Sequence, residues 1–526
     1  MSTRSSDEER VAFLSSDPRS SDTELDDFLD KPRHHKKPLP LQTRLRAWLC
    51  SRPRLLRRNV FRHPLLAILI ASKYILIALA ILLLATPFII PSYTRLPPHY
   101  RDLKARCKGS TPAPGCANPH NERVFISVSL YDKGGHLAGG RWGEQMLELI
   151  HMLGPDNTFL SIYENDSPLG KAPLEAFKRK VPCAHNIVYD DAVSLEGFGN
   201  VTLPNGSVRM KRLSYLSEMR NRALRPLDRF RTDNGLTAFD KVLFLNDVYF
   251  HTEDAAQLLF NTNMGDDGRA HYLSACALDY DKPFKFYDLY ATRDAEGYSN
   301  GLPLFPIFST AGQGLSRQDM LAQKDAVRVT SCWSGMVAMQ ARYVQNLAPE
   351  LPTPGFDTIG AHVIDPEHPT TVQAPVRFRY EPEIFVDACE CCLFLADVST
   401  AARNTGAVEQ GVFINPYVRV AYDDFVLRWL HRVKWWERLF VIPHGIISYL
   451  SGLPRNNPLR EVQEGDPFVE EIWTKENRWE LVNRTGRNGL FCAVREMQLI
   501  STEQRTGDKN WKNYDMPPGQ ALWFPT

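Results

Sequence analysis

Short apolar runs alternate with helix-spaced segments from residue 124 onward. Residues 124–130 (VFISVSL) form a continuous apolar run of strand length, and residues 142–153 then place apolar side chains at helical spacing. The alternation continues with strand-like runs at 157–166, 185–191 and 241–250 and helix-like segments at 173–180 and 213–227. Strands and helices in regular alternation predict an α/β fold with a mostly parallel sheet flanked by helices.

A longer apolar segment precedes this region. Residues 65–90 (LLAILIASKYILIALAILLLATPFII) contain one charge, Lys73, whose long side chain can reach the near membrane interface. About 20 apolar residues suffice for a helix to cross a bilayer. A cleaved signal peptide is disfavoured because it would start near the N-terminus. The segment predicts a single transmembrane anchor over residues 65–91.

The charges that flank the anchor predict its orientation. Seven arginines and no acid lie between residues 44 and 62. The basic residues after the anchor are fewer, and the acid Asp102 lies among them. By the positive-inside rule the N-terminus is cytoplasmic and the C-terminal body lumenal, as in a type II signal-anchor protein of the Golgi or ER membrane. Four glycosylation sequons follow the anchor, which suits a glycoprotein: Asn165, Asn200, Asn205 and Asn483.

Composition shifts along the chain predict five parts. They are a disordered cytoplasmic tail (1–63), the anchor (65–91), a stem (92–120), a catalytic α/β domain (121–450) and a C-terminal extension of unknown role (451–526). The net charge of +1, from 62 basic and 61 acidic residues, gives no reason to expect a nucleic-acid partner. An oxidising lumen favours disulfides, and Cys107 with Cys116 is the easiest local pair, with buried free thiols as the alternative.

The candidate chemistry lies in carboxylates at strand ends. The chain lacks G-x-G-x-x-G after its first strand, a P-loop and a G-x-S-x-G elbow. Asp247 follows the apolar run 242–245, and Asp279 ends a second such run. Oxygen ligands at strand ends suit Mg²⁺ or Mn²⁺, which would neutralise a departing diphosphate, and Arg220, Arg222 and Arg293 would add positive charge.

Several segments, taken in order, resemble one known family. The sequence "FLNDV" after an "RN-x-AL" helix is similar to GT-A glycosyltransferases. The closer match is the fungal family of cryptococcal α-1,3-mannosyltransferase and capsule-associated proteins, glycosyltransferase family 69. The resemblance extends over residues 121–430 and rests on the segments "SIYENDSP", "YLSEMRNRAL", "FLNDVYF", "ACALDYDKPFKFYDLYATRDAEG", "VTSCWSGMVAM", "CECCLFLADV" and "INPYVRVAYD". The resemblance implies a GT-A-like fold and a retaining, metal-dependent transferase that uses GDP-mannose and forms α-1,3-mannosyl links on a glycan.

The resemblance also implies roles for individual residues. Asp247 would hold the metal against the diphosphate with Asn246 beside it, and Arg220 and Asn221 would face the donor. Asp279 is the alternative metal ligand; Asp247 is favoured because it follows the helix that carries Arg220. The donor and acceptor pocket would be lined by Asp279, Asp288, Arg293, Asp294 and Glu296, with Trp333 in a flanking turn. Ser334 stands where the family leads us to expect asparagine.

Three other functions fit parts of the sequence. A glycoside hydrolase would also use paired carboxylates, but without metal or nucleotide. A non-catalytic lumenal sugar-binding or scaffold protein would keep the fold and lose the metal. A membrane adaptor would act through the basic, serine-rich tail. Sensitivity of activity to a chelator separates the transferase from the hydrolase.

Overall fold

The computed structural model describes residues 64–109, 112–191, 193–229, 231–232, 235–236, 238–347, 358–360, 362–406, 411–474, 476–501 and 511–514. The prediction for the tail, residues 1–63, lies outside them. Helix α3 (Pro64–Ile89) belongs to one compact unit, and the chain from Pro91 onward, here called the body, belongs to the other. Within α3, the 22-residue stretch Ile68–Ile89 is long and apolar enough to cross a bilayer. This agrees with the predicted anchor, whereas its orientation and organelle stay predictions.

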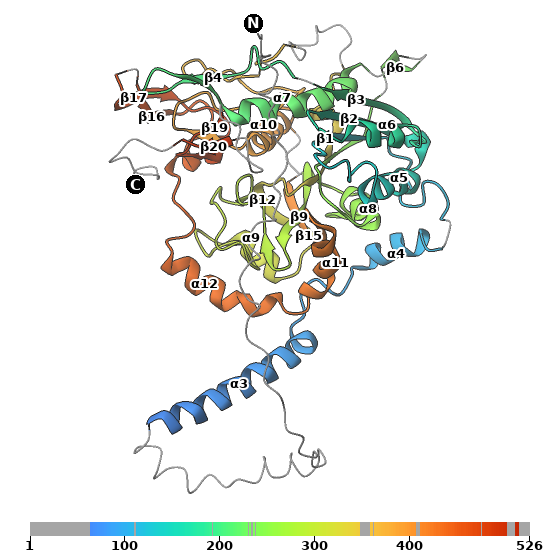
Figure 1. The fold of residues 1–526 in the computed structure, drawn as a ribbon, viewed down its shortest axis with the longest axis vertical. Coiled ribbons are helices and arrows are strands. Elements are labelled where there is room, and N and C mark those ends of the chain that lie inside the picture. The colour runs from blue at the N-terminus through green and yellow to red at the C-terminus, as the bar shows by residue number, and fades with distance from the viewer. Residues whose placement is uncertain are drawn as a thin grey trace, which may run out of the picture. The chain divides into compact units, whose positions relative to one another are not determined.

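A mixed, mostly parallel sheet forms the centre of the body (Figure 1). Its strands lie in the order β11 (Arg293–Asp294), β12 (Val327–Ser331), β15 (Val412–Ala421), β9 (Ser274–Lys282), β13 (Met336–Gln340), β8 (Lys241–Leu245), β1 (Val124–Leu130), β2 (Thr158–Asn165) and β3 (Ala184–Asp190), with β10 (Lys285–Phe286) beside β9. Strands β3, β2, β1 and β8 are mutually parallel, and β9 is parallel to β15. Strand β13 runs antiparallel between β8 and β9, so those two strands point the same way. The predicted fold class is confirmed.

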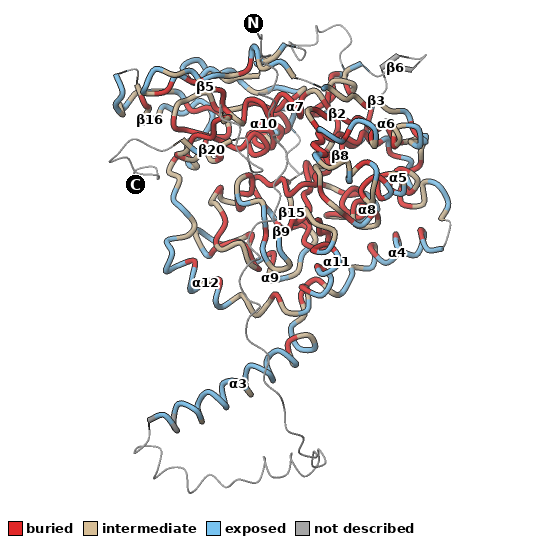
Figure 2. The backbone as a smooth tube through the Cα atoms, in the orientation of Figure 1, coloured by how far each residue is buried: buried red, intermediate tan, exposed pale blue. Residues whose placement is uncertain are grey.

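The two faces of the sheet bury two separate apolar cores. Along β8, Val242 and Phe244 point into the core that includes α10 (Glu390–Asn404). Leu243 and Leu245 point into the opposite core with α5 (Arg141–Leu153) and α8 (Thr252–Asn261). Alternate side chains of a strand point to opposite faces, so a strand covered on both sides is a continuous apolar run. Figure 2 shows these central elements as largely buried.

Smaller elements surround this centre. The further helices are α4 (Pro98–Arg106), α6 (Lys171–Lys178), α7 (Arg212–Leu224), α9 (Leu315–Leu321), α11 (Asp424–Val433) and α12 (Val441–Leu450). The strand pairs are β4 (Asn200–Thr202) with β5 (Val208–Met210), β6 (Arg231–Thr232) with β7 (Gly235–Leu236), β14 (Asp387–Ala388) with β18 (Ala493–Val494), β16 (Pro467–Trp473) with β17 (Trp479–Thr485), and β19 (Gln498–Ile500) with β20 (Trp511–Asn513). The pairing of β14 with β18 joins the predicted C-terminal extension to the predicted catalytic domain.

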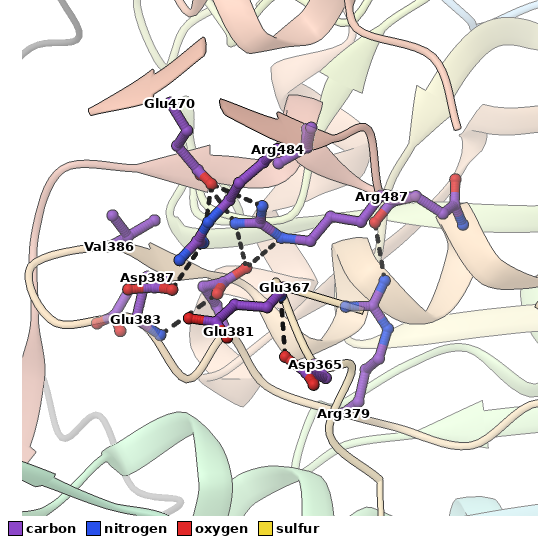
Figure 3. Close-up of polar contacts among 12 residues, drawn as sticks. Asp365, Glu367, Arg379, Glu381, Glu383, Val386, Asp387, Glu470, Arg484 and Arg487 are labelled. Carbon is purple, nitrogen blue, oxygen red and sulfur yellow. Dashed lines mark hydrogen bonds and ion pairs between the residues drawn. The ribbon is translucent and has the colours of Figure 1, made fainter. Parts of the chain in front are cut away.

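Buried ion pairs also bind the β16–β17 hairpin to the rest of the body (Figure 3). Arg487 donates to both carboxylate oxygens of Glu470, each at 2.9 Å, and also contacts Glu381 at 3.3 Å. Arg484 bridges Glu470 and Glu383 at 3.0 and 2.7 Å. These pairs link the hairpin to the segment that leads into α10. Breaking a buried pair leaves an unpaired charge, so the cluster fixes where the hairpin lies.

Three disulfides reinforce the body. The predicted Cys107–Cys116 bond is confirmed, and Cys276–Cys332 and Cys392–Cys492 join segments far apart in the sequence. Among the described cysteines, Cys183, Cys389 and Cys391 are free and buried. Of the four sequons, Asn165 is buried and its amide donates to Tyr215, which makes it a poor glycan attachment site; Asn200, Asn205 and Asn483 are exposed.

Candidate active site

A cavity of about 470 Å³ lies at the carboxyl ends of β1, β8 and β9. Ligands of open α/β sheets bind at this edge. Strand ends, two loops, α7 and the start of α10 all contribute to its wall. Its lining consists of Ser129, Arg212, Leu216, Arg220, Asn246, Asp247, Asp279, Tyr287, Asp288, Leu289, Tyr290, Ala291, Trp333, Ser334, Gly335, Cys389, Glu390, Cys391, Tyr422, Glu496, Gln498 and Trp511.

Asp247 presents a carboxylate to this cavity directly after β8. Within the described part of the chain, its side chain makes no ion pair or hydrogen bond with another side chain. Burial raises the pKa of Asp247 to about 7, with smaller opposing effects from a hydrogen bond to its own backbone and from the positive charge of Arg220. A carboxylate that is partly buried and bonded to no other side chain is suited to bind a cation, because a bound cation would offset the cost of burying its charge.

Arg220 organises the wall next to Asp247. Its Nε donates to the Glu390 carboxylate at 3.1 Å, and its Nη1 donates to the Asn246 side-chain oxygen at 3.0 Å. The guanidinium carbon lies 5.0 Å from the centre of the Trp333 ring. Trp333 Nε1 donates to the same Asn246 oxygen at 3.3 Å. A guanidinium held from several sides loses little freedom when it meets an anion, so the wall presents a fixed positive charge.

Asp279 and Asp288 form a buried pair at the cavity. Asp279 accepts hydrogen bonds from the Tyr422 hydroxyl and from the Asp288 backbone N–H, each at 3.1 Å. Asp288 accepts from the backbone N–H groups of Ala291 and Ser334, each at 2.9 Å. Burial raises the pKa of both carboxyls, and repulsion from Asp288 raises that of Asp279 further. Unlike Asp247, these two carboxyls accept hydrogen bonds from other residues and so hold the surrounding loops.

A disulfide holds the turn that carries Trp333. Cys276 lies in β9, three residues before Asp279, and its bond to Cys332 ties that strand to the turn. Ser334 has a φ of 54° and Gly335 a φ of 70°. Asparagine is favoured over serine in this left-handed region, which gives a conformational reason for the asparagine expected at position 334. A Cβ on Gly335 would lie 2.7 Å from Val248, so the close approach favours glycine.

The structure divides the predicted site residues into two groups. The cavity brings together Arg220, Asn246, Asp247, Asp279, Asp288 and Trp333. The other four predicted residues, Asn221, Arg293, Asp294 and Glu296, are not among the lining residues. Trp333 is itself 4% exposed and packs edge-on against Phe378, so most of the ring belongs to the core.

The four residues outside the lining hold backbone in place. Asn221 exchanges two hydrogen bonds with the backbone of Phe378, at 2.8 and 2.9 Å. Arg293 donates to four backbone carbonyls. Asp294 accepts from the N–H groups of Glu296 and Tyr298, each at 2.9 Å, and burial raises its pKa to about 6. Glu296 accepts from the Gln313 N–H at 2.7 Å. These contacts shape the loops next to the cavity, and the predicted roles of these residues in the pocket stay predictions.

Sequence reasoning missed one wall of the cavity. Glu496, Gln498 and Trp511 come from the C-terminal part, where Arg212 donates to Gln498 at 2.6 Å and lies 4.3 Å from the Trp511 ring centre. Cys389, Glu390 and Cys391 also line the cavity, with one ligand atom of each within 4.8 Å of the others. No local motif marks Glu496, Gln498 and Trp511, because only long-range contacts bring them to the strand ends, whereas residues 389–391 lie in the segment "CECCLFLADV" that carries the family resemblance.

The cavity is suited to an anionic ligand held by a cation. A mostly parallel sheet flanked by helices places acids at the carboxyl ends of parallel strands, beside a fixed arginine. Residues 123–397, more than half of the chain, match the family model described as Cryptococcal mannosyltransferase 1. The chain belongs to this family of mannosyltransferases.

Other similarities are weaker. No curated protein shows significant similarity to the chain. Among solved structures, the mannosyltransferase PcManGT from Pyrobaculum calidifontis, in complex with GDP-Man and Mn²⁺, matches with 9% sequence identity over 74% of this chain and 88% of that chain. The TM-score is 0.28, which is too low to support any statement about this chain's site.

Proposed function

We propose that the protein is a metal-dependent mannosyltransferase that transfers mannose from GDP-mannose to a glycan hydroxyl, with retention and an α-1,3 linkage. The observation that carries this proposal is the partly buried carboxylate of Asp247, which is bonded to no other described side chain and faces a cavity beside the fixed guanidinium of Arg220. Membership of a mannosyltransferase family supports mannose as the transferred sugar.

Asp247 is the residue that would hold the metal. Carboxylate oxygens are the donors that Mn²⁺ and Mg²⁺ prefer, and among the three cavity aspartates Asp247 is the one whose side chain accepts no hydrogen bond from another described residue. A divalent ion bound there would supply positive charge against the diphosphate. Asp279 serves instead as a buried hydrogen-bond acceptor that positions Tyr422 and the loop at Asp288.

Arg220 acts on the departing diphosphate. Its charge is held in place before the reaction, so stabilising new negative charge on the leaving oxygen requires little rearrangement. Asn246 and Glu390 orient the guanidinium. No lining side chain is assigned as a nucleophile. The bond from the mannose anomeric carbon to the diphosphate oxygen breaks, the incoming hydroxyl attacks the same face, and its proton passes to the leaving diphosphate. The transition state has oxocarbenium character, as in glycoside chemistry.

The C-terminal wall is assigned to the acceptor. Gln498 and Glu496 offer polar groups and Trp511 an aromatic ring opposite the strand ends, a combination suited to sugar hydroxyls and sugar faces.

We place the protein in the Golgi or ER membrane as a single-pass type II protein with the body in the lumen. Three disulfides in the body support an oxidising compartment.

Transfer of radiolabelled mannose from GDP-mannose tests the proposal. The full chain in detergent would be incubated with mannoside acceptors, with Mn²⁺ or with EDTA, and the anomeric configuration of the product read by NMR. We expect transfer with retention that EDTA abolishes and that Asp247→Asn lowers at least a hundredfold. Asp281→Asn is the matched control, because Asp281 is not a lining residue and pairs with Lys285 at 2.7 Å.

Each rival function has its own result in this assay. Release of mannose from mannosides without nucleotide and despite EDTA would show a glycoside hydrolase. Metal-dependent binding of GDP-mannose without transfer to any acceptor would favour a sugar-binding protein. Equal activity loss in Asp247→Asn and Asp281→Asn would remove the special role of Asp247.

A further inference from the structure

Helix α12 turns its polar side chains inward and its apolar side chains outward. His444 and Ser448 are buried and lie four residues apart, so they share one side of the helix. The exposed apolar side chains of α12 are Ile442, Ile446, Ile447, Tyr449 and Leu450, with exposed fractions of 73%, 55%, 45%, 84% and 76%. A surface helix of a globular protein normally has the reverse arrangement. Figure 2 shows most of α12 as exposed.

Contacts on the inner side fix this orientation. The His444 ring contacts the Arg317 guanidinium at 3.2 Å, and the Ser448 hydroxyl accepts from the Leu302 N–H at 3.2 Å. Arg317 also donates to the Val441 carbonyl at the start of the helix, at 3.2 Å. Turning the apolar side inward would break all three contacts. The outward apolar side is therefore a stable feature of the fold, and such an exposed patch marks an interaction surface.

Aromatic and basic side chains continue this surface along α11 and the connection to α12. Phe425 and Trp429 of α11 are exposed, as is Trp435, and Arg432 lies 4.5 Å from the centre of the Trp429 ring. Between residues 425 and 455 the sequence contains one acid, Glu437, which is buried against Arg419 at 2.8 Å. The exposed charged side chains in this stretch are all basic: Arg428, Arg432 and Arg455. Arg428 also pairs with Asp424, the first residue of α11, at 3.3 Å. We call these exposed side chains of residues 425–455 the α11–α12 face.

This composition fits a membrane interface better than a protein partner of another kind. Tryptophan and tyrosine concentrate at the level of the lipid headgroups, and arginine pairs with lipid phosphates. An amphipathic helix at a membrane lies in the plane of the interface, with its apolar side among the acyl chains. Helices α11 and α12 lie along one edge of the body (Figure 1).

The chain itself connects this edge to the predicted membrane span. Helix α3 ends at Ile89, and three residues later the Ser92 N–H donates to the carbonyl of Lys434 at 2.8 Å. Tyr93 is buried, and its hydroxyl donates to the Met320 carbonyl at 2.9 Å. Three residues of extended chain reach at most about 11 Å. Lys434 stands between α11 and α12, so chain connectivity alone ties the α11–α12 face to the end of the span.

We propose that the α11–α12 face rests in the headgroup layer of the bilayer that α3 crosses, with α12 lying in the interface plane. The body is then attached to the membrane by two contacts, the span and this face. The proposal depends on α3 spanning a bilayer and does not depend on the proposed transferase activity.

Spin labels on two matched leucines test it. Leu450 of α12 is 76% exposed and Leu481 of β17 is 72% exposed, so each tolerates a labelled cysteine equally well. The full chain, with Cys50→Ser to remove a cysteine outside the described residues, would carry Leu450→Cys or Leu481→Cys. After labelling with a nitroxide it would be reconstituted into phosphatidylcholine vesicles that contain phosphatidylserine. Power-saturation spectroscopy then compares collisions with oxygen, which concentrates in lipid, and with a water-soluble nickel chelate.

We expect oxygen accessibility to exceed nickel accessibility several-fold at position 450 and the reverse at position 481. Nickel accessibility at position 450 equal to that at position 481 would overturn the proposal. Spin–spin broadening at position 450 that disappears on dilution with unlabelled chain would show that a second copy covers the face instead, and would also overturn it. Release of the chain from the vesicles by carbonate would show that α3 does not span, which removes the basis of the proposal whether or not the protein transfers mannose.

Discussion

Replacing Asp247 with asparagine should stabilise the ligand-free protein while removing its binding of GDP with Mn²⁺. The two side chains have nearly the same shape, so the change removes the charge and leaves the packing. Burial raises the pKa of Asp247 from an ordinary value of 3.8 to about 7. This rise corresponds to about 4 kcal/mol of unfavourable free energy when the group is ionised. We take this as an upper limit, because Asp247 is partly exposed in the cavity wall.

The sign of this effect depends on pH. Below about pH 4 the carboxyl is protonated in both the folded and the unfolded chain, and the penalty is absent. Between pH 4 and pH 7 the unfolded chain loses the proton while the folded chain keeps it, so the free energy of unfolding falls as pH rises. Above pH 7 the penalty is complete. Asparagine cannot ionise, so the advantage of Asp247→Asn should be absent at pH 4 and fully present at pH 8.

Two measurements on the full chain in detergent check this prediction. Thermal unfolding, followed by tryptophan fluorescence, should show a melting temperature several degrees higher for Asp247→Asn at pH 8 and unchanged at pH 4. Calorimetric titration of GDP with Mn²⁺ at pH 8 should show binding to the parent and none to the variant. Asp281→Asn should change neither result. A variant that melts lower than the parent at both pH values, or that still binds GDP with Mn²⁺ at the parent's affinity, would refute the reasoning.

Three further substitutions test other parts of the structure. Arg220→Lys should weaken GDP binding about tenfold, because lysine cannot make both of the arginine's contacts. Arg222→Lys, which lies outside the cavity lining, should leave GDP binding unchanged. Equal losses of affinity in calorimetric titration would contradict the role given to Arg220. Cys392→Ser opens a disulfide loop with a sequence separation of 100 and should lower the free energy of unfolding by about 5 kcal/mol, whereas Cys107→Ser, with a separation of 9, should lower it by about 2.5 kcal/mol. Urea unfolding measures both losses, and the reverse order would contradict the prediction. Arg487→Met leaves Glu381 without its arginine and leaves Glu470 with Arg484 alone. It should cost about 3–5 kcal/mol in urea unfolding; a loss of about 1 kcal/mol or less, as for an exposed ion pair, would contradict this.

Local sequence patterns were sufficient to predict the first half of the sheet. The run 124–130 coincides with β1, and the helix-spaced residues 142–153 lie within α5. In each of these elements the apolar residues follow one clear spacing, and each element lies next to the one that follows it in the sequence. The central place of β13 was not predictable in this way. Met336–Gln340 runs antiparallel between β8 and β9, and its short apolar run carries no sign of direction or neighbours.

The candidate site shows the same limit. Asp247 and Asp279 were predicted because each ends an apolar run, and both line the cavity. The sequence could not distinguish a free carboxylate from one already used by the protein, because the partners of Asp279 are Tyr422 and the backbone of Asp288. Arg293 likewise looked like a candidate for the site by charge alone, and its guanidinium is occupied by backbone carbonyls. Hydrogen bonds of this kind join residues that are distant in the sequence, so local patterns do not reveal them.

The C-terminal wall of the cavity has a practical consequence for experiments with shortened chains. A protein ending near residue 450 would contain the whole sheet and the match to the family, yet it would lack Gln498 and Trp511 from the wall and Cys492 from its disulfide. It would also leave Glu381 without the arginine that neutralises it. An inactive fragment of this kind would report lost folding or a breached pocket and would say nothing about Asp247. Deletions meant to separate catalysis from acceptor choice should therefore be replaced by single substitutions in the intact chain.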